Sequence, residues 1–219
     1  GGLEYCYFAT FQPLSNDMKI LKTWAVAVAT VALSGTAQAA LQDRGNGMIY
    51  DTTRNITWLA DMTYAKTSGY DADGLMSWSA AKAWADNLTF GGYSDWRLPT
   101  LNAGDISCTS NFNPGGGFGQ QYYGYGCTGG ELSGLFVTDL GNKAGESVLT
   151  QTGDTAEQIA NLALFRNVQS WDYWSGTEFA PNPAAAWIFS TYDGTQIYGS
   201  NVSRLYAVAV RPGDVAAVP

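Results

Sequence analysis

The chain has 219 residues, of which 46% are hydrophobic and 14% charged, and its formal net charge at pH 7 is −8. This acidity argues against nucleic acids and sulfated polyanions as partners, because they carry charge of the same sign. The sequence contains no histidine, which excludes a Ser-His-Asp triad, a Cys-His pair and a His-ligated zinc site.

The first 39 residues predict export. Met18 to Lys22 is a short basic start, Trp24 to Leu33 is an apolar run too short to span a membrane, and Ala37-Gln-Ala39 is a small-x-small cleavage site. We expect a signal peptide over residues 18–39, preceded by a non-native upstream extension over residues 1–17. The alternative is a genuine N-terminal segment followed by a buried apolar helix.

Residues 40–214 are long enough for one domain with a sizeable core. We expect no stable membrane span in the residues present, and the tail at 215–219 carries no fold signal. Two cysteines, Cys108 and Cys127, remain after cleavage, and an even pair in an exported chain predicts a disulfide. It would contribute roughly 3 kcal/mol by closing a loop of about 20 residues. The alternative, a reactive thiol pair, lacks nearby basic groups that would activate it.

The first half of the predicted domain begins with a β-hairpin. Met48–Tyr50 and Asn55–Leu59 are β-prone runs joined by a turn, and a polar loop follows over residues 64–74. In that loop, Asp71-Ala-Asp73-Gly74 has the pattern that opens a calcium loop, although the rest of an EF-hand is missing. This loop has two interpretations. Either Asp71 and Asp73 bind calcium, or the segment is a solvated turn.

Ser77 predicts the N-cap of a helix that runs to about Leu88. We expect Trp78 and Trp84 on this helix to be core anchors; the alternative is a ligand platform. The helix leads into a rigid corner over residues 95–100.

Within the corner, Pro99 forces the preceding residue into an extended conformation. Alternation puts Asp95 and Arg97 on one side and Trp96 on the other. We expect Arg97 to be a largely buried clamp, bonded to Asp95 or to backbone carbonyls of residues 171–178, because its guanidinium can hold several oxygens together. The alternative is a ligand contact at Arg97.

The second half of the domain predicts two helices and then strands. Apolar residues recur at helical spacing from Leu132 to Leu140, and Thr155-Ala-Glu-Gln158 is a capping box ahead of an apolar stripe that includes Ile159. The predicted strands cover residues 173–178, 185–192, 195–198 and 205–210, with a hairpin turn at Asp193-Gly194. The last strand should be buried and should lie beside the opening hairpin. The expected class is α+β, loop-rich, with short antiparallel strands and two or three short helices.

Three separated motifs resemble the bacterial Lcl C-terminal domain family, a domain of unknown function. They are Asp95-Trp-Arg-Leu-Pro-Thr100, Tyr173-Trp-Ser-Gly-Thr177 and Ala209-Val-Arg-Pro-Gly213, and the likeness covers roughly residues 45 to 214. The first motif is also similar to a corner in the formylglycine-generating (sulfatase-modifying) enzymes. This resemblance implies a C-type-lectin-like fold in which Asp95, Trp96, Arg97, Pro99 and Trp174 are structural residues.

The resemblance further implies an exported module of the envelope, cell surface or extracellular matrix. Carbohydrate or glycosaminoglycan binding is reported for an adhesin member, and the acidity of this chain favours a neutral or capsular polysaccharide, or another cell-surface partner. Related chains often end in a PEP-CTERM sorting tail, so residues 215–219 are expected to begin a missing sorting signal. The formylglycine-generating enzymes work through cysteines near the end of their domain, and residues 201–212 contain none.

Exposed aromatic side chains are the predicted sugar-binding groups. The candidate rings are the loop tyrosines Tyr122, Tyr123 and Tyr125, together with Tyr173. Glu178 is a further candidate ligand-binding residue. Glu178 and Asp172 are the nearest candidates for a pair of glycosidase carboxylates; the alternative is a pair of surface carboxylates. The leading hypothesis is a non-enzymatic binding module without a cofactor other than calcium. The alternatives are a degenerate enzyme of the formylglycine-generating type and a purely structural matrix component.

Overall fold

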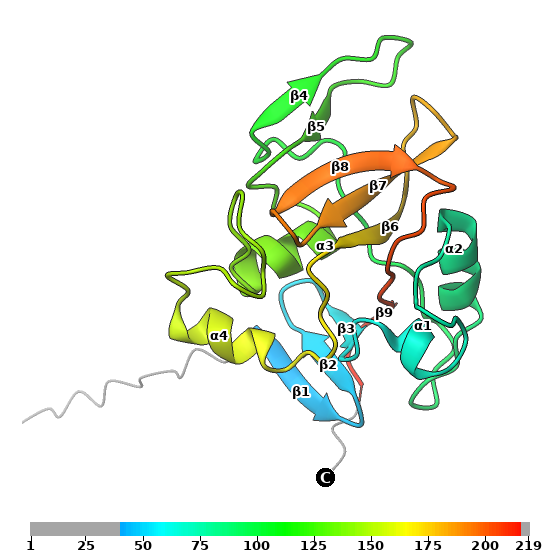
Figure 1. Cartoon of the computed structure of the whole chain (residues 1–219), viewed down its shortest axis with the longest axis vertical. Coiled ribbons are helices and arrows are strands. Elements are labelled where there is room, and N and C mark those ends of the chain that lie inside the picture. Colours follow the sequence, from blue (N-terminus) through cyan, green and yellow to red (C-terminus); the bar gives the residue numbers. More distant parts are fainter. Residues whose placement is uncertain (1–39, 216–219) are drawn as a thin grey trace, which may run out of the picture. The chain divides into compact units, whose positions relative to one another are not determined.

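The structure is a computed structural model that describes residues 40–215 (Figure 1). The predicted signal peptide, the predicted upstream extension and residues 216–219 of the tail lie outside the described residues. In the described part, the strands form three antiparallel sheets, ordered β1-β2-β3-β9, β4-β5 and β6-β7-β8. The α+β, loop-rich class with short antiparallel strands is confirmed.

The four-stranded sheet joins the two ends of the described chain. Its strands are β1 (Leu41–Gly45), β2 (Met48–Asp51), β3 (Ile56–Leu59) and β9 (Val210–Pro212). The hairpin of β2 and β3 is confirmed, and β3 pairs with β9, so the expected contact between the opening hairpin and the end of the domain is confirmed. Strand β1, which pairs with β2, was not predicted.

The predicted strand over residues 205–210 is wrong in extent. Only Val210 belongs to β9, whereas the stretch before it forms single bridges, from Leu205 to Met76 and from Tyr206 to Tyr173. Ala207, whose side chain is buried, lies in the same stretch. The stretch before Val210 is therefore apolar because it is buried between other elements, and not because it forms a continuous strand.

The three-stranded sheet carries several of the large aromatic side chains of the core, among them Trp174 and Trp187. It consists of β6 (Asp172–Glu178), β7 (Ala185–Ser190) and β8 (Thr195–Ser200), and every residue of β7 is buried. The turn between β7 and β8 forms at Gly194, whose φ of 77° favours glycine, as predicted. The ring of Phe189 stacks on Phe136 with 5.5 Å between centroids. This contact packs the sheet against the helical segment after residue 130.

That helical segment begins as α3 (Glu131–Ser133) and continues as a π-helix, η1 (Gly134–Asp139). The apolar side chains predicted there, at Leu132, Leu135, Phe136 and Leu140, are all fully buried. A Cβ atom at Gly134 would collide with the guanidinium of Arg54. Glycine at this position therefore lets Arg54 reach across and bind Asp139, with 2.6 Å between Nη1 and Oδ2.

Helix α2 (Trp78–Asp86) begins where it was predicted, with Ser77 accepting a hydrogen bond from the Ala80 amide. Trp84 is buried, and Trp78 packs against the core and donates from Nε1 to the Ser175 carbonyl at 2.8 Å. The core-anchor interpretation of both tryptophans is confirmed. Helix α1 (Tyr64–Thr67) is a single turn inside the segment that was expected to be a loop, so the described part has one helix more than predicted.

Helix α4 (Ala156–Leu162) has the predicted capping box between Thr155 and Gln158. Its predicted apolar stripe faces the core only in part: Leu162 packs against the core, whereas Ile159 is 60% exposed. The buried side chain is Asn161, which donates to the Asp139 carbonyl at 3.0 Å. The hydrogen bond to the end of η1 and the packing of Leu162 therefore set the rotation of this helix together.

The corner over residues 95–100 brings the three sequence motifs together. The Arg97 amide and carbonyl both bond to Val210 at 2.8 Å, so the corner continues the sheet beyond β9. The Pro99 carbonyl accepts from the Gly176 amide at 2.8 Å. Trp96 and Trp174 are buried, and Trp174 Nε1 donates to the Met76 carbonyl at 2.8 Å.

The Arg97 side chain is a clamp, but its predicted partners are wrong. Its guanidinium donates to both carboxylate oxygens of Glu131, each at 2.7 Å, and Glu131 also accepts from the Thr100 amide at 2.8 Å. Asp95 instead accepts from Arg211, at 2.8 and 3.0 Å. The strand β9 brings Arg211 to Asp95, and the start of α3 brings Glu131 to Arg97. The Arg97 side chain is also 36% exposed and therefore not largely buried.

Glu131 should make the stability of the domain depend on pH. Burial tends to raise its pKa, but the bonds from Arg97 and Thr100 outweigh burial and leave the pKa lowered. The stability that the lowered pKa contributes is fully present above the unfolded-state pKa of a glutamate, about 4.3. It is lost as the pH falls through the lower pKa of the folded state.

We predict that Arg97→Ala lowers the free energy of unfolding by about 1.5–3 kcal/mol, because it removes charge-assisted bonds from a carboxylate that stays partly buried. Thermal and urea denaturation at pH 7 measure this loss. Arg204→Ala is the matched control, since its pair with Asp73 is well exposed and its loss should leave the stability close to that of the wild type. Equal melting temperatures for Arg97→Ala and the wild type would contradict the clamp.

Candidate functional site

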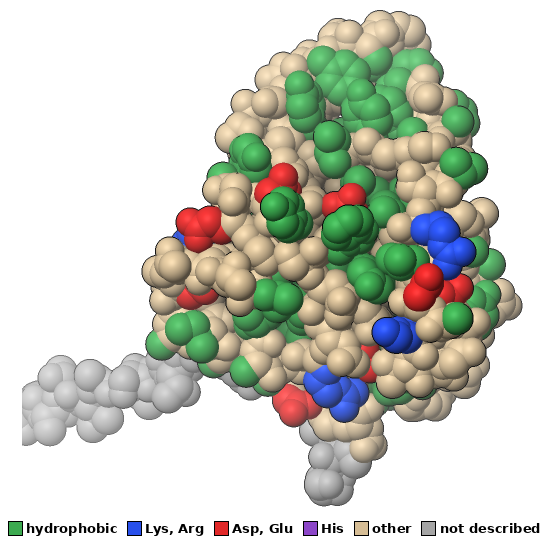
Figure 2. All heavy atoms as spheres, in the orientation of Figure 1, with side chains coloured by type: hydrophobic (Ala, Val, Ile, Leu, Met, Phe, Trp, Pro, Cys, Tyr) green, Lys and Arg blue, Asp and Glu red, His purple; other side chains and the backbone are tan. Residues whose placement is uncertain are grey.

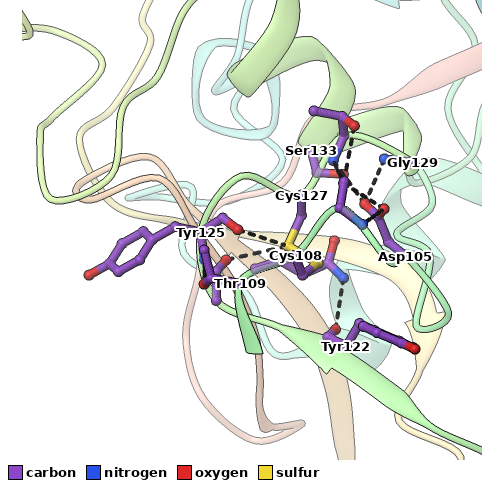
Figure 3. Close-up of a disulfide and its surroundings, with 12 residues drawn as sticks. Asp105, Cys108, Thr109, Tyr122, Tyr125, Cys127, Gly129 and Ser133 are labelled. Atoms are coloured by element: carbon purple, nitrogen blue, oxygen red, sulfur yellow. Dashed lines mark hydrogen bonds between the residues drawn. A yellow bond between two sulfur atoms is a disulfide. The ribbon is translucent and has the colours of Figure 1, made fainter. Parts of the chain in front are cut away.

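The predicted disulfide between Cys108 and Cys127 is present, with 4.3 Å between the two Cα atoms (Figure 3). Between the cysteines, β4 (Ser110–Phe112) and β5 (Gln121–Tyr123) pair as a hairpin. The loop is therefore partly ordered by its own strands as well as by the covalent link.

Asp105 fixes the base of this loop, although the sequence analysis did not single it out. It accepts from the Ser107 hydroxyl at 2.6 Å, from the Thr128 amide at 2.8 Å and from the Gly129 amide at 2.6 Å. Burial tends to raise the pKa of Asp105, but these bonds outweigh burial and lower it. An Asp two residues before a Ser is a local turn signal, but the bonds across the loop depend on the disulfide pairing.

The three predicted loop tyrosines, Tyr122, Tyr123 and Tyr125, are half-buried. Tyr123 packs edge-on against Phe112, with 5.9 Å between centroids, so its ring is partly used in packing. Figure 3 shows the Tyr125 side chain pointing away from the disulfide. Tyr125 also lines an open groove of about 420 Å³, which makes it the best placed of the three for a ligand.

Tyr173 is not a surface residue, and its predicted role as a ligand-binding ring is wrong. The side chain is fully buried against Phe136, and its hydroxyl accepts from the Gln169 amide at 2.9 Å. Burial raises the pKa of the Tyr173 hydroxyl. Its place on a strand could be read from the sequence, but the face that it occupies depends on what packs over the sheet.

Glu178 is exposed at the far end of β6 from Asp172. Asp172 pairs with Ser190 and Glu178 with Ala186, so four residues of β7, roughly 13 Å of strand, separate the two positions, which is beyond the spacing that a glycosidase pair requires. The structure therefore does not bring these two candidate carboxylates together.

Asp71 and Asp73 form a turn with the following backbone. Asp71 accepts from the Gly74 amide at 2.8 Å, and Asp73 accepts from the Leu75 amide at 2.9 Å and from Arg204 at 2.9 Å. These bonds account for both carboxylates as turn-forming acceptors. Calcium binding at this position stays a prediction.

Trp171 and Tyr192 are exposed aromatic residues on backbone segments that lie side by side, and the sequence analysis did not propose them. Trp171 precedes β6 and is 54% exposed, and Tyr192 follows β7 and is 64% exposed. The two are held close because Trp171 and Thr191 exchange hydrogen bonds, from the Thr191 amide to the Trp171 carbonyl and from the Trp171 amide to Thr191 Oγ1, both at 3.0 Å. The sequence signal that could have identified these two residues is an aromatic residue just outside each of two paired strands.

Carboxylates accompany these two rings. Asp172 follows Trp171, and Asp193 follows Tyr192 and accepts from the Thr195 amide at 3.2 Å. Burial raises the pKa of Asp172, the bond from Ser190 opposes this rise, and the charge of Asp193 adds to it. We call Trp171, Asp172, Tyr192 and Asp193 the Trp171 surface.

Figure 2 shows apolar side chains next to acidic ones on the face that lies over β6, β7 and β8 in Figure 1. The Trp171 surface combines these two kinds of side chain at the ends of β6 and β7. Flat apolar rings beside hydrogen-bond acceptors suit a ligand with an apolar face and several hydroxyl groups.

Comparison with protein-family models, with curated proteins and with solved structures finds no match to this chain. Among the helices within residues 40–215, none combines the length and the hydropathy that a membrane span requires.

We predict that reducing the disulfide lowers the free energy of unfolding by roughly 3 kcal/mol, because it restores conformational freedom to the unfolded loop. The loss should appear in urea denaturation with and without a strong thiol reductant. A Cys108→Ser, Cys127→Ser double variant serves as the control, since the reductant should not change its stability. Unchanged stability of the reduced wild type would show that the bonds to Asp105 hold the loop alone.

Proposed function

We propose that this domain is an exported, non-enzymatic module of the bacterial envelope or extracellular matrix that binds carbohydrate. The observation that carries the proposal is the exposure of Trp171 and Tyr192, each followed in the chain by an aspartate, Asp172 or Asp193. Large aromatic rings normally bury their apolar surface, so two neighbouring exposed rings favour a binding site.

The chemistry of the Trp171 surface suits a neutral sugar. The C–H face of a pyranose ring can stack on an indole or phenol ring, while carboxylate oxygens accept bonds from neighbouring hydroxyl groups. The net charge of −8 and the two carboxylates would repel a sulfated or phosphorylated chain.

The disulfide supports export, because disulfides persist mainly in oxidising compartments. We further propose that the domain is related to the Lcl C-terminal domain family and has a C-type-lectin-like fold. The convergence of the three resembling motifs in the corner and the pairing of β3 with β9 support this relationship.

We predict that Trp171→Ala and Tyr192→Ala each lower the affinity for a neutral oligosaccharide about tenfold, because each removes one stacking surface. A glycan array with the purified protein identifies the sugar, and isothermal calorimetry measures the affinity. Melting temperatures should stay close to the wild type, since both rings are exposed.

Tyr70→Ala is the matched control, because Tyr70 is 57% exposed but lies on the loop between α1 and α2. Its affinity should equal that of the wild type. Failure of the wild type to bind any neutral glycan would refute the proposal, and so would full affinity in both Trp171→Ala and Tyr192→Ala.

A further inference from the structure

The groove lined by Tyr125 has two walls of different origin. One wall contains Thr109, Tyr125 and Gly126, which are next to Cys108 and Cys127 in the chain. The other wall comes from the end of η1, the turn over residues 141–144 and Gln158 of α4. The disulfide and the helices therefore hold the two walls, and the volume of about 420 Å³ lies in the lower part of the range for small-ligand sites.

The lining of the groove suits a neutral ligand. Val137 and Ala144 provide apolar surface along with the Tyr125 ring. Thr109 Oγ1 accepts from the Tyr125 amide at 3.0 Å, which leaves its own proton free to be donated. The ammonium group of Lys143 is paired with Asp154 at 2.8 Å, so the cation at this wall is already neutralised.

Asn142 lines the groove and carries an unpaired but enclosed amide oxygen. Its side chain is only 4% exposed, and Nδ2 donates to the Glu146 carbonyl at 2.8 Å, whereas Oδ1 has no donor within residues 40–215. An unpaired buried amide oxygen is unfavourable. Because Oδ1 is enclosed, it does not offer the groove an accessible acceptor.

Backbone hydrogen bonds link the groove to the Trp171 surface. The loop that follows residue 141 forms one wall of the groove and bonds to the turn that carries Tyr192. The Gly145 amide donates to the Asp193 carbonyl at 2.8 Å, and the Val148 amide donates to the Thr191 carbonyl at 2.9 Å. One short loop therefore fixes the groove relative to the exposed rings.

We propose that this groove is a second sugar subsite, which takes one neutral sugar unit of the same chain that stacks on the Trp171 surface. Tyr125 supplies the stacking ring, and the Thr109 hydroxyl bonds to a sugar hydroxyl group. This inference rests on the proposed function. It adds that the domain recognises an extended glycan and binds a hexasaccharide more tightly than a disaccharide.

The test uses maltohexaose, cellohexaose and chitohexaose, with the corresponding disaccharides, titrated calorimetrically into the full protein. For the sugar that binds, Tyr125→Ala should lower the hexasaccharide affinity about tenfold and the disaccharide affinity far less. The ratio of the two affinities should therefore fall. This ratio is measured on one sample, so a general loss of folded protein does not change it.

The outcomes separate this inference from the proposed function. If Tyr125→Ala keeps the wild-type ratio while Trp171→Ala loses affinity, the groove is not a subsite and the proposed function stands. If the wild type binds none of these sugars and no neutral glycan on an array, the proposed function fails and the groove inference fails with it. Tyr70→Ala, which changes neither surface, should keep both affinities.

Discussion

The corner over residues 95–100 is the constraint on which the rest of the structure depends. Its backbone pairs with Val210 at one end and with Gly176 at the other, so it links the four-stranded sheet to the three-stranded sheet. The bond between Arg97 and Glu131 adds the start of α3 to the same junction. A loop-rich domain has few long ladders, and one junction that joins two sheets and a helix limits how these parts can move.

The surfaces proposed to bind sugar follow from how the core is packed. Every residue of β7 is buried, so its rings Trp187 and Phe189 belong to the core, whereas Trp171 and Tyr192, just beyond the strand ends, remain exposed. The groove beside Tyr125 lies between the segment next to the disulfide and Val137 of η1. Both sites thus rest on rigid supports, which reduces the entropy lost on binding.

Local signals in the sequence determined the elements that depend on neighbouring residues. Ser77 and Thr155 mark helix starts, Gly194 marks a hairpin turn, and the two cysteines form their expected link, because caps, turns and cysteine pairing need few distant contacts. The α+β class followed from the same signals. The short strand β1 was missed because its sequence is polar and its pairing with β2 supplies most of the order.

Tertiary structure alone decided which partner each side chain meets. Arg97 binds Glu131 and not Asp95, because α3 and β9 arrive from distant parts of the chain. Tyr173 is buried while Trp171, two residues earlier, is exposed, a difference set by what packs over each end of β6. The sequence by itself therefore determined the local elements, the disulfide pair and the importance of the corner. The candidate site depended on long-range packing, which no local pattern encodes.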